Sequence, residues 1–156
     1  MTTETTDRIE KQVLLRAPRE RVWRALTDAE QFGAWFGVAF DRGATFAPGA
    51  RVQGKVTHEG YEHLTWDVTI ERMEPQRLFS WHWHPHPIDP QRDYEAEPTT
   101  QVVFELEEVA GGTRLTVTES GFDTIPLERR AEAYRGNEEG WEWQMESIAR
   151  YVAEAP

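Results

Sequence analysis

Cysteine is absent from the sequence. Its absence excludes disulfides, iron–sulfur clusters, zinc sites built on thiolates and cysteine nucleophiles together. Long apolar runs are missing as well, so no segment offers the roughly 18 consecutive apolar residues that a membrane-spanning helix needs. Residues 1–10, MTTETTDRIE, are polar and acidic, so we expect no signal peptide. These absences together predict a cytoplasmic protein without membrane contact.

Basic residues are scarce, because 17 Lys and Arg stand against 28 Asp and Glu, a formal net charge of −11 at pH 7. Nucleic acids and anionic membranes both favour a basic face, so we expect neither as a partner. The glycine patterns of phosphate and dinucleotide sites are missing, and no serine lies in a G-x-S-x-G nucleophile motif. We therefore expect no cofactor.

Aromatic residues are abundant: the chain has seven Trp, seven Phe and four Tyr among its 156 residues. Large aromatic side chains can build a core that the apolar content of 38% would understate. The length is typical of one domain, and we find neither a repeat nor a linker that would divide the chain. We expect a single domain over residues 1–156, with residues 1–7 disordered.

The first 37 residues predict a strand and two short helices. Apolar residues alternate through 8–16, which indicates a half-buried strand. Pro18 is well suited to the first position of a following helix. Residues 28–31, Asp-Ala-Glu-Gln, have the form of a capping box that begins a second helix, and Gly37 marks its end.

The middle of the chain predicts an antiparallel sheet. Alternating apolar residues indicate strands within 51–57, 64–70, 79–83, 102–106 and 115–117. Short polar links, typical of hairpin turns, separate several of them at 58–60, 74–76 and 110–112. Residues 85–98 contain four prolines, at 85, 87, 90 and 98, and therefore form a loop.

The turns also predict how two of these hairpins pair. If Pro75 and Gln76 centre a two-residue turn, Ile70 lies opposite Trp81, Val68 opposite Trp83, Thr69 opposite His82 and Asp67 opposite His84. If residues 58–60 form a three-residue turn with Gly60 at positive φ, Val52 lies opposite Trp66. Both registers place the apolar residues on one face and point His82 and His84 to the other.

The end of the chain changes to a helical period. Apolar residues fall on one stripe between Trp141 and Val152, and Asn137 is a candidate cap for this helix. A shorter, separate helix is predicted at 127–134. The terminal helix is the longest expected element, so we expect it to cover the apolar face of the sheet.

Three stretches carry a resemblance to a known superfamily: APRERVWRALTDAEQFGAWFG (17–37), TTQVVFELEEVAGGTRLTVTESGF (99–122) and NEEGWEWQMESIARYV (137–152). In this order they resemble the START-like, or SRPBCC, helix-grip superfamily, and its branch related to the activator of heat-shock protein 90 ATPase. The resemblance implies an α+β fold in which a curved antiparallel sheet grips a long C-terminal helix. It is weak evidence for function, because the superfamily contains binders, enzymes and co-chaperones.

The same resemblance implies a cavity between sheet and helix that receives an apolar small molecule. Its expected lining is apolar and mostly aromatic: Trp35, Phe36, Phe40, Trp66, Trp81, Trp83, Phe104, Trp141 and Met145. The alternative is that these side chains simply fill the core. Within the loop, Arg92, Asp93 and Tyr94 are candidate lid residues at the cavity mouth, unless the loop is an ordered surface segment held by its prolines.

Three histidines, His82, His84 and His86, stand at a spacing of two in the stretch WHWHPHP. On a strand such a spacing points side chains the same way, as in some zinc sites. The predicted register turns His82 and His84 away from the helix, and related oxygenase domains bind iron through a helix-borne histidine spacing that this chain lacks. We therefore expect no metal site, unless the loop folds back and brings His63 or Asp89 beside them.

We favour a domain that binds an apolar or aromatic small molecule without catalysis. A first alternative, implied by the family name and tied to the stress response, is contact with a chaperone. Co-chaperones of that family carry an additional N-terminal domain, which we do not expect here. A second alternative is a cofactor-free enzyme on an aromatic substrate, with Asp67, Arg92, Asp93, Tyr94 or a histidine as acid or base. An inward-facing ionisable group with a displaced pKa would favour that alternative. The oligomeric state stays open.

Overall fold

The computed structural model describes residues 8–87, 89 and 91–154. The strands are β1 (Arg8–Leu15), β2 (Val38–Phe40), β3 (Arg51–Val56), β4 (Thr65–Glu74), β5 (Leu78–Trp83), β6 (Thr100–Val109) and β7 (Gly112–Ser120). The helices are α1 (Arg19–Thr27), α2 (Ala29–Phe36), the short 3₁₀ turn η1 (Phe122–Thr124) and α3 (Leu127–Glu154). The expected disorder of residues 1–7 falls outside the described residues.

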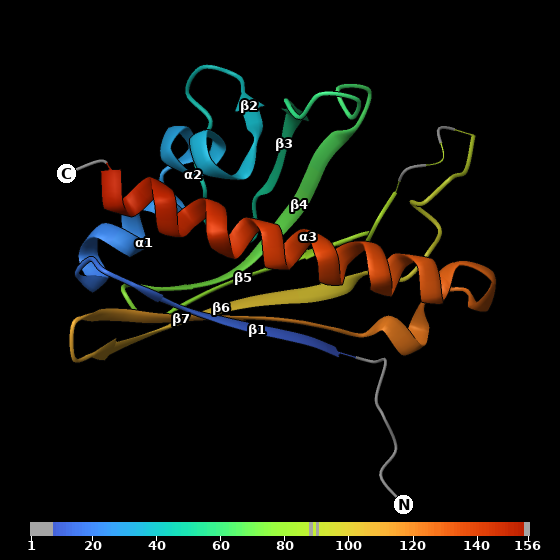
Figure 1. Ribbon diagram of the computed structural model, residues 1–156. Coiled ribbons are helices and arrows are strands. Elements are labelled where there is room, and N and C mark those ends of the chain that lie inside the picture. Colours follow the sequence, from blue (N-terminus) through green and yellow to red (C-terminus); the bar gives the residue numbers. More distant parts are fainter. Residues whose placement is uncertain (1–7, 88, 90, 155–156) are drawn as a thin grey trace, which may run out of the picture.

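The strands form one antiparallel sheet in the order β1-β7-β6-β5-β4-β3-β2. Figure 1 shows this sheet curving beneath α3, with α1 and α2 at the end of the sheet where the C-terminus lies. The predicted α+β helix-grip architecture is therefore confirmed. Among the described residues no helix combines the length and apolar composition required to cross a bilayer.

The start and end of α2 follow from local chemistry. The Asp28 side chain accepts a hydrogen bond from the Gln31 backbone N–H at 3.0 Å, as the capping pattern predicts. Gly37 then takes a left-handed conformation, with φ of 95°, and its N–H donates to the Gly33 carbonyl. Pro18 stands one position before the first residue of α1, as its N-cap, rather than inside the first turn.

The C-terminal region is one continuous helix, so the prediction of two helices with a cap at Asn137 is wrong. Gly136 is helical and lies against the ring of His86, where a Cβ would come within 2.5 Å of the His86 ring. Asn137 lies inside the helix and uses its side chain to bond Glu119 on β7. Gly136 and Asn137, which lie where the break was expected, therefore make contacts with the loop and the sheet instead.

The hairpin between β4 and β5 combines a bulge with a longer turn. Thr69 pairs with His82 and Ile70 with Trp81, as predicted, but the register shifts by one residue at Glu71. The turn consequently contains three residues, 75–77, with Gln76 at a φ of 62°. The predicted two-residue turn is therefore wrong. The bulge offsets the extra turn residue, so the predicted pairs of Thr69 and Ile70 are still correct.

The predicted pairing of Val52 with Trp66 is also wrong, because Val52 pairs with Val68 and Gly54 with Trp66. The connection between β3 and β4 is longer than three residues and contains two successive turns, closed by the N–H of Tyr61 and of Leu64. A shift of two residues leaves each side chain on its original face. Trp66 therefore still points inward.

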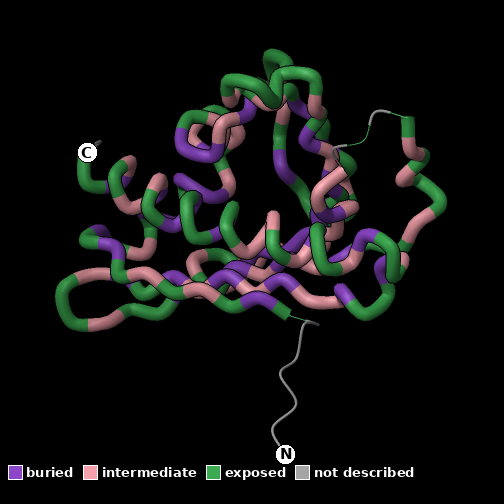
Figure 2. Tube along the Cα trace, turned by 45° about the vertical axis from the view of Figure 1, so that its right-hand side comes forward, coloured by how far each residue is buried: buried purple, intermediate pink, exposed green. Residues whose placement is uncertain are grey.

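The core beneath α2 and α3 is largely aromatic. Phe32 lies at its centre, with ring centroids 5.1 Å from Trp66 and 5.8 Å from Trp81. Trp81 has no exposed surface. Gly54 makes room for this cluster, since a Cβ there would collide with Val38 and lie 2.9 Å from Phe40. Figure 2 shows the buried positions concentrated on the inner face of the sheet and under the helices.

Candidate ligand-binding cleft

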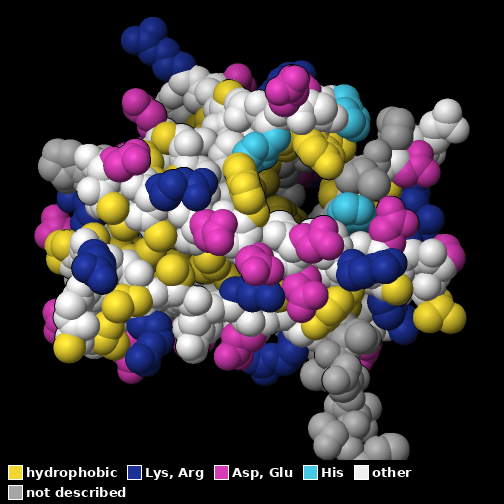
Figure 3. Space-filling view, viewed as in Figure 1, with side chains coloured by type: hydrophobic (Ala, Val, Ile, Leu, Met, Phe, Trp, Pro, Cys, Tyr) yellow, Lys and Arg dark blue, Asp and Glu magenta, His cyan; other side chains and the backbone are white. Residues whose placement is uncertain are grey.

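An open cleft of about 940 Å³ lies where the β3–β4 connection, the 84–98 loop and the middle of α3 meet. This volume is in the range of pockets that hold small molecules. Figure 3 shows the hollow with histidine and apolar side chains at its edge. The curvature of the sheet creates the space, because β3 and β4 rise away from α3 there (Figure 1).

The inner wall of the cleft is apolar and comes from four elements. Phe36 ends α2, Trp66 lies on β4 and Trp83 ends β5. Gly140 and Gln144 of α3 complete the wall. A Cβ at Gly140 would have no atom within 4 Å, so the glycine leaves this part of the cleft open.

Two exposed aromatic side chains stand at the cleft mouth. Tyr61, in the β3–β4 connection, is 54% exposed, and Trp143, on α3, is 46% exposed. The Trp143 ring packs edge-on against His58, with centroids 4.7 Å apart. His58 is held in turn by the Phe36 carbonyl, 3.0 Å from its Nε2. Exposed aromatic groups beside an apolar hollow are typical of binding sites.

Two buried polar atoms in the cleft wall have no hydrogen-bond partner among the described residues. One is Gln144 Oε1, whose amide nitrogen donates to the Phe36 carbonyl at 2.8 Å. The other is Trp66 Nε1. Buried polar atoms are normally paired, so these two are exceptions. Both have almost no exposed surface, so a ligand would reach them only after a small movement of the cleft wall.

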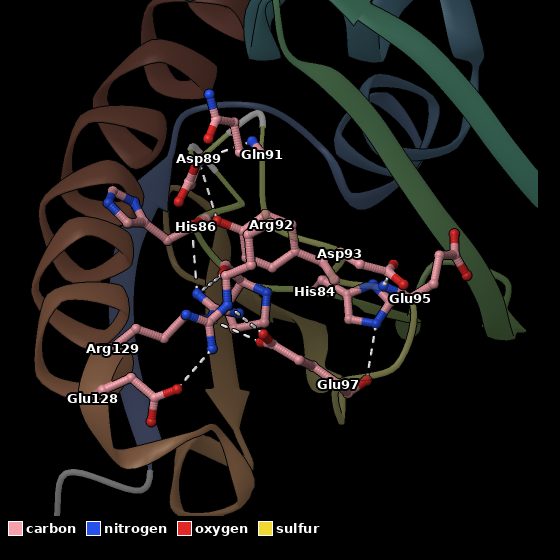
Figure 4. Close-up of polar contacts among 12 residues, drawn as sticks. His84, His86, Asp89, Gln91, Arg92, Asp93, Glu95, Glu97, Glu128 and Arg129 are labelled. Carbon is pink, nitrogen blue, oxygen red and sulfur yellow. Dashed lines mark hydrogen bonds and ion pairs between the residues drawn. The ribbon is translucent and has the colours of Figure 1, made fainter.

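The 84–98 loop is attached to the start of α3 by a buried ion pair (Figure 4). Arg129 donates to Glu97 at 2.8 Å, and its guanidinium lies 4.7 Å from the centre of the Tyr94 ring. Arg92 donates to the same Glu97 carboxylate at 2.5 Å. Burial opposes ionisation of Glu97, but the two arginine hydrogen bonds outweigh it and hold the pKa of Glu97 below its ordinary value.

On its other side the same loop is tied to the sheet through Arg51 of β3. Arg51 donates two hydrogen bonds to Asp67, at 2.9 and 2.7 Å, and one to Glu95 at 2.8 Å. His84, the residue predicted opposite Asp67, lies 3.0 Å through its Nε2 from the Glu97 carbonyl. It still interacts electrostatically with Asp67, whose pKa is lowered by the hydrogen bonds from Arg51 and further by this attraction. The loop bridges sheet and helix across the cleft mouth.

Arg92, Asp93 and Tyr94, the lid candidates, all contribute to the cleft lining. Residues 88 and 90 of the same loop lie outside the residues that the structure describes. The position of the three candidates at the mouth is compatible with a lid, which stays a prediction.

The histidines of WHWHPHP separate into different environments. His82 lies 2.7 Å from the bulged Glu71 on the outer face of the sheet, as its predicted orientation requires. His84 and His86 line the cleft, and His84 does so beside Asp67, the residue predicted opposite it. His84 follows the last residue of β5, and the strand alternation no longer applies there. Among the described residues, no three His, Asp or Glu side chains are grouped as metal ligands would be.

The nine side chains expected to line the cavity are divided by the structure. Phe36, Trp66 and Trp83 line the cleft, and Trp141 lines a small recess of about 90 Å³ beside it. The remaining five belong to the packed interior and do not reach the cleft wall: Trp35, Phe40, Trp81, Phe104 and Met145. The aromatic rings fill the space beneath α2, so the open volume lies further toward the loops.

Sequence reasoning missed Glu119, a carboxyl group with no exposed surface on β7. It accepts hydrogen bonds from Thr100 at 2.5 Å, from the indoles of Trp83 and Trp141 at 2.8 Å each, and from Asn137 at 2.9 Å. Burial outweighs these bonds and raises the pKa of Glu119. Since Trp83 and Asn137 line the cleft, Glu119 lies directly behind its wall.

The fold and the cleft define a START-like helix-grip protein. The family model described as "Activator of Hsp90 ATPase homolog 1-like protein" matches residues 16–153, and the chain belongs to this family. Fold and family together support a ligand-binding or chaperone-associated domain. No curated protein matches the chain at a significant level.

Solved structures share the fold. A Mesorhizobium loti protein is 23% identical with a TM-score of 0.72, covering 96% of this chain and 98% of its own. A Staphylococcus saprophyticus protein is 26% identical with a TM-score of 0.63, covering 94% and 92%. DynU16, from the dynemicin biosynthetic locus, is 25% identical with a TM-score of 0.70, and the match covers 95% of this chain but 48% of DynU16.

Proposed function

We propose that this protein binds an apolar or aromatic small molecule in the cleft and performs no chemistry on it. The observation that carries the proposal is an open volume of about 940 Å³ with an aromatic inner wall and exposed aromatic rings at its mouth. A cytoplasmic location and a lid role for the 84–98 loop belong to the same proposal.

The chemistry of Glu119 supports a binding role over catalysis. An inward-facing carboxyl group with a raised pKa is what a cofactor-free enzyme would need as acid or base. Both oxygens of Glu119 are occupied by protein donors, however, and the Trp83 and Asn137 side chains separate it from the cleft. A ligand in the cleft would contact those side chains and not the carboxyl group.

Gly140→Leu tests the proposal, because its Cβ would meet no protein atom within 4 Å and the longer side chain would extend from this lining position of the cleft. Native mass spectrometry of freshly purified protein should show an excess mass, lost on denaturation, in the wild type and in a Gly140→Ala control. The excess should be reduced at least about tenfold in Gly140→Leu. An equal excess in all three proteins, or none after incubation with a panel of aromatic compounds, would contradict the proposal.

The family description favours contact with a chaperone as a second candidate. The exposed Tyr61 and Trp143 side chains could then receive an apolar segment of a partner protein. Addition of this protein to purified Hsp90 would raise the ATPase rate under this candidate. An unchanged rate at saturating protein would exclude it and leave small-molecule binding untouched.

A further inference from the structure

We propose that the ligand of the cleft is a cation: an aromatic or apolar body that carries an ammonium or similar positively charged group. This inference rests on the proposed function and adds the charge of the ligand to it. It follows from three independent features of the cleft: the sign of its fixed charges, its exposed aromatic faces, and an unpartnered acceptor in its wall.

Carboxylates dominate the charged residues that line the cleft. Six of them are acidic: Glu59, Asp67, Asp89, Asp93, Glu95 and Glu139. Among the described lining residues Arg92 is the single Arg or Lys, and it already pairs with Glu97 and with Glu128 at 3.0 Å. The cleft therefore offers an excess of negative charge, which a low-dielectric hollow concentrates.

Part of this negative charge is compensated and part is not. Asp67 and Glu95 share the guanidinium of Arg51. Four other carboxylates of the lining form no ion pair with a described residue: Glu59, Asp89, Asp93 and Glu139. They belong to three of the elements that line the cleft: the β3–β4 connection, the 84–98 loop and α3. An anion entering the cleft would be repelled by them, whereas a cation would be attracted.

The aromatic side chains of the cleft suit the same class of ligand. The faces of Tyr61, Trp83 and Trp143 can stack with an aromatic body or receive a cation. The protein uses this contact itself beside the cleft, where the guanidinium of Arg129 lies over Tyr94. Aromatic rings combined with nearby carboxylates are the features that recognise organic cations.

Gln144 provides a specific acceptor in the cleft wall. The side chain is only 8% exposed, its amide nitrogen is fixed by the Phe36 carbonyl, and its Oε1 has no partner among the described residues. This oxygen has almost no exposed surface, so an ammonium N–H would satisfy it after a small movement of the cleft wall. Trp66 Nε1, the unpartnered donor, could bond a hydroxyl or carbonyl oxygen on the ligand body.

The experiment compares three probes of nearly equal shape: 2-naphthylmethylammonium, 2-naphthylmethanol and 2-naphthoate. Binding is measured by isothermal titration calorimetry at about pH 8, well above the ordinary carboxyl pKa. We expect the cation to bind at least about fivefold more tightly than the neutral alcohol, and the anion more weakly than the alcohol. The preference should shrink as salt rises from about 0.01 to 0.15 M.

A charge-neutral variant provides the control. Asp93→Asn with Glu139→Gln should bring the affinity for the cation close to the affinity for the alcohol in the same variant. Glu142→Gln changes an exposed carboxylate on α3 outside the cleft lining. It should change neither the affinity for the cation nor the affinity for the alcohol. Equal binding of cation and alcohol, or a preference that survives in the neutral variant, would overturn this inference while the proposed function stands. Failure of all three probes to bind would contradict the proposed function and this inference together.

Discussion

Glu119 receives hydrogen bonds from side chains of three elements: Trp83 on β5, Thr100 on β6, and Asn137 and Trp141 on α3. Each of these bonds fixes a group that would otherwise be free to rotate. The carboxyl group thereby connects the long helix to the sheet and sets the orientation of two side chains in the cleft wall. The Thr100 hydroxyl can donate to the carboxylate or accept from its protonated form, so both states keep their bonds.

The raised pKa of Glu119 predicts a particular dependence of stability on pH. Between the ordinary carboxyl pKa and the raised folded value, the native state holds a proton that the unfolded chain has released. Glu119 therefore contributes stability that is fully present below the ordinary pKa and is lost as pH rises through the folded pKa. The loss proceeds at up to about 1.4 kcal/mol per pH unit.

Comparison with Glu119→Gln isolates this effect, since all other titrating groups are shared. The unfolding free energy of the wild type minus that of the variant should fall as pH rises from about 4 to 8. Urea unfolding at a series of pH values gives the difference. Glu107→Gln, which changes an exposed carboxylate on β6, serves as the matched control and should show no such trend. A difference that is constant or grows with pH would refute the assignment.

Part of this residue-level picture could be read from the sequence. Leu115, Val117 and Glu119 alternate on one strand, so the apolar pattern already turns Glu119 inward. Its donors could not be predicted, because they come from distant parts of the chain. An inward carboxyl group at the end of an apolar alternation is the signal that could have identified it.

At the scale of elements, α3 and the 84–98 loop depend on each other. Arg129 and Glu97 join them by an ion pair that is about nine-tenths buried on both sides, and His86 packs against Gly136. Removing one partner of a buried pair leaves an uncompensated charge, which makes such contacts costly to break. The helix continues through Gly136. A glycine is required at this position because the His86 ring lies too close for a Cβ.

The two glycines of α3 provide a matched pair of substitutions. Alanine favours a helix over glycine by roughly 1 kcal/mol, so Gly140→Ala, where the new Cβ meets nothing, should stabilise the protein by about 0.5–1 kcal/mol. Gly136→Ala should destabilise it by at least about 1 kcal/mol, because the Cβ would overlap the His86 ring. Thermal and denaturant unfolding measure both.

Removal of the His86 side chain shows whether this ring causes the loss of stability in Gly136→Ala. In a His86→Ala background the ring is gone, so Gly136→Ala should become neutral or stabilising. A penalty at Gly136 that persists without the His86 side chain would show that the close approach is not its cause.

Sequence patterns predicted the elements better than their connections. Periodicity located every strand except the three-residue β2, since each of the others has one apolar face. The capping pattern located the start of α2. Asn137, read as a helix cap, suggested a break in α3, but its side chain bonds Glu119 instead. The bulge at Glu71 altered the register of β4 with β5, and the long β3–β4 connection altered the register of β3 with β4. A bulge leaves no local sequence signal when the bulged residue is polar and lies among other polar residues.

At the scale of the whole molecule, the core and the cleft occupy different parts of the space between sheet and α3. The rings around Phe32 and Trp81 fill one part, whereas the curvature of β3 and β4 opens the other. The resemblance to the helix-grip fold implied a cavity, and three of the nine side chains expected to line it do line the cleft: Phe36, Trp66 and Trp83. The resemblance could not predict how far the rings fill the interior, since that depends on loop conformations and on the space left by Gly54 and Gly140.

The measurement that tests the central claim most directly is a titration followed by the indole N–H signals of the seven tryptophans in a ¹⁵N-labelled sample. With 2-naphthylmethylammonium or 2-naphthylmethanol, the signals of Trp66, Trp83 and Trp143 should shift saturably. The signal of Trp35, whose indole donates to the Ala25 carbonyl at 2.7 Å in the packed interior, should stay in place. Shifts confined to buried tryptophans outside the cleft, or no saturable shift with either compound, would contradict a ligand site in this cleft.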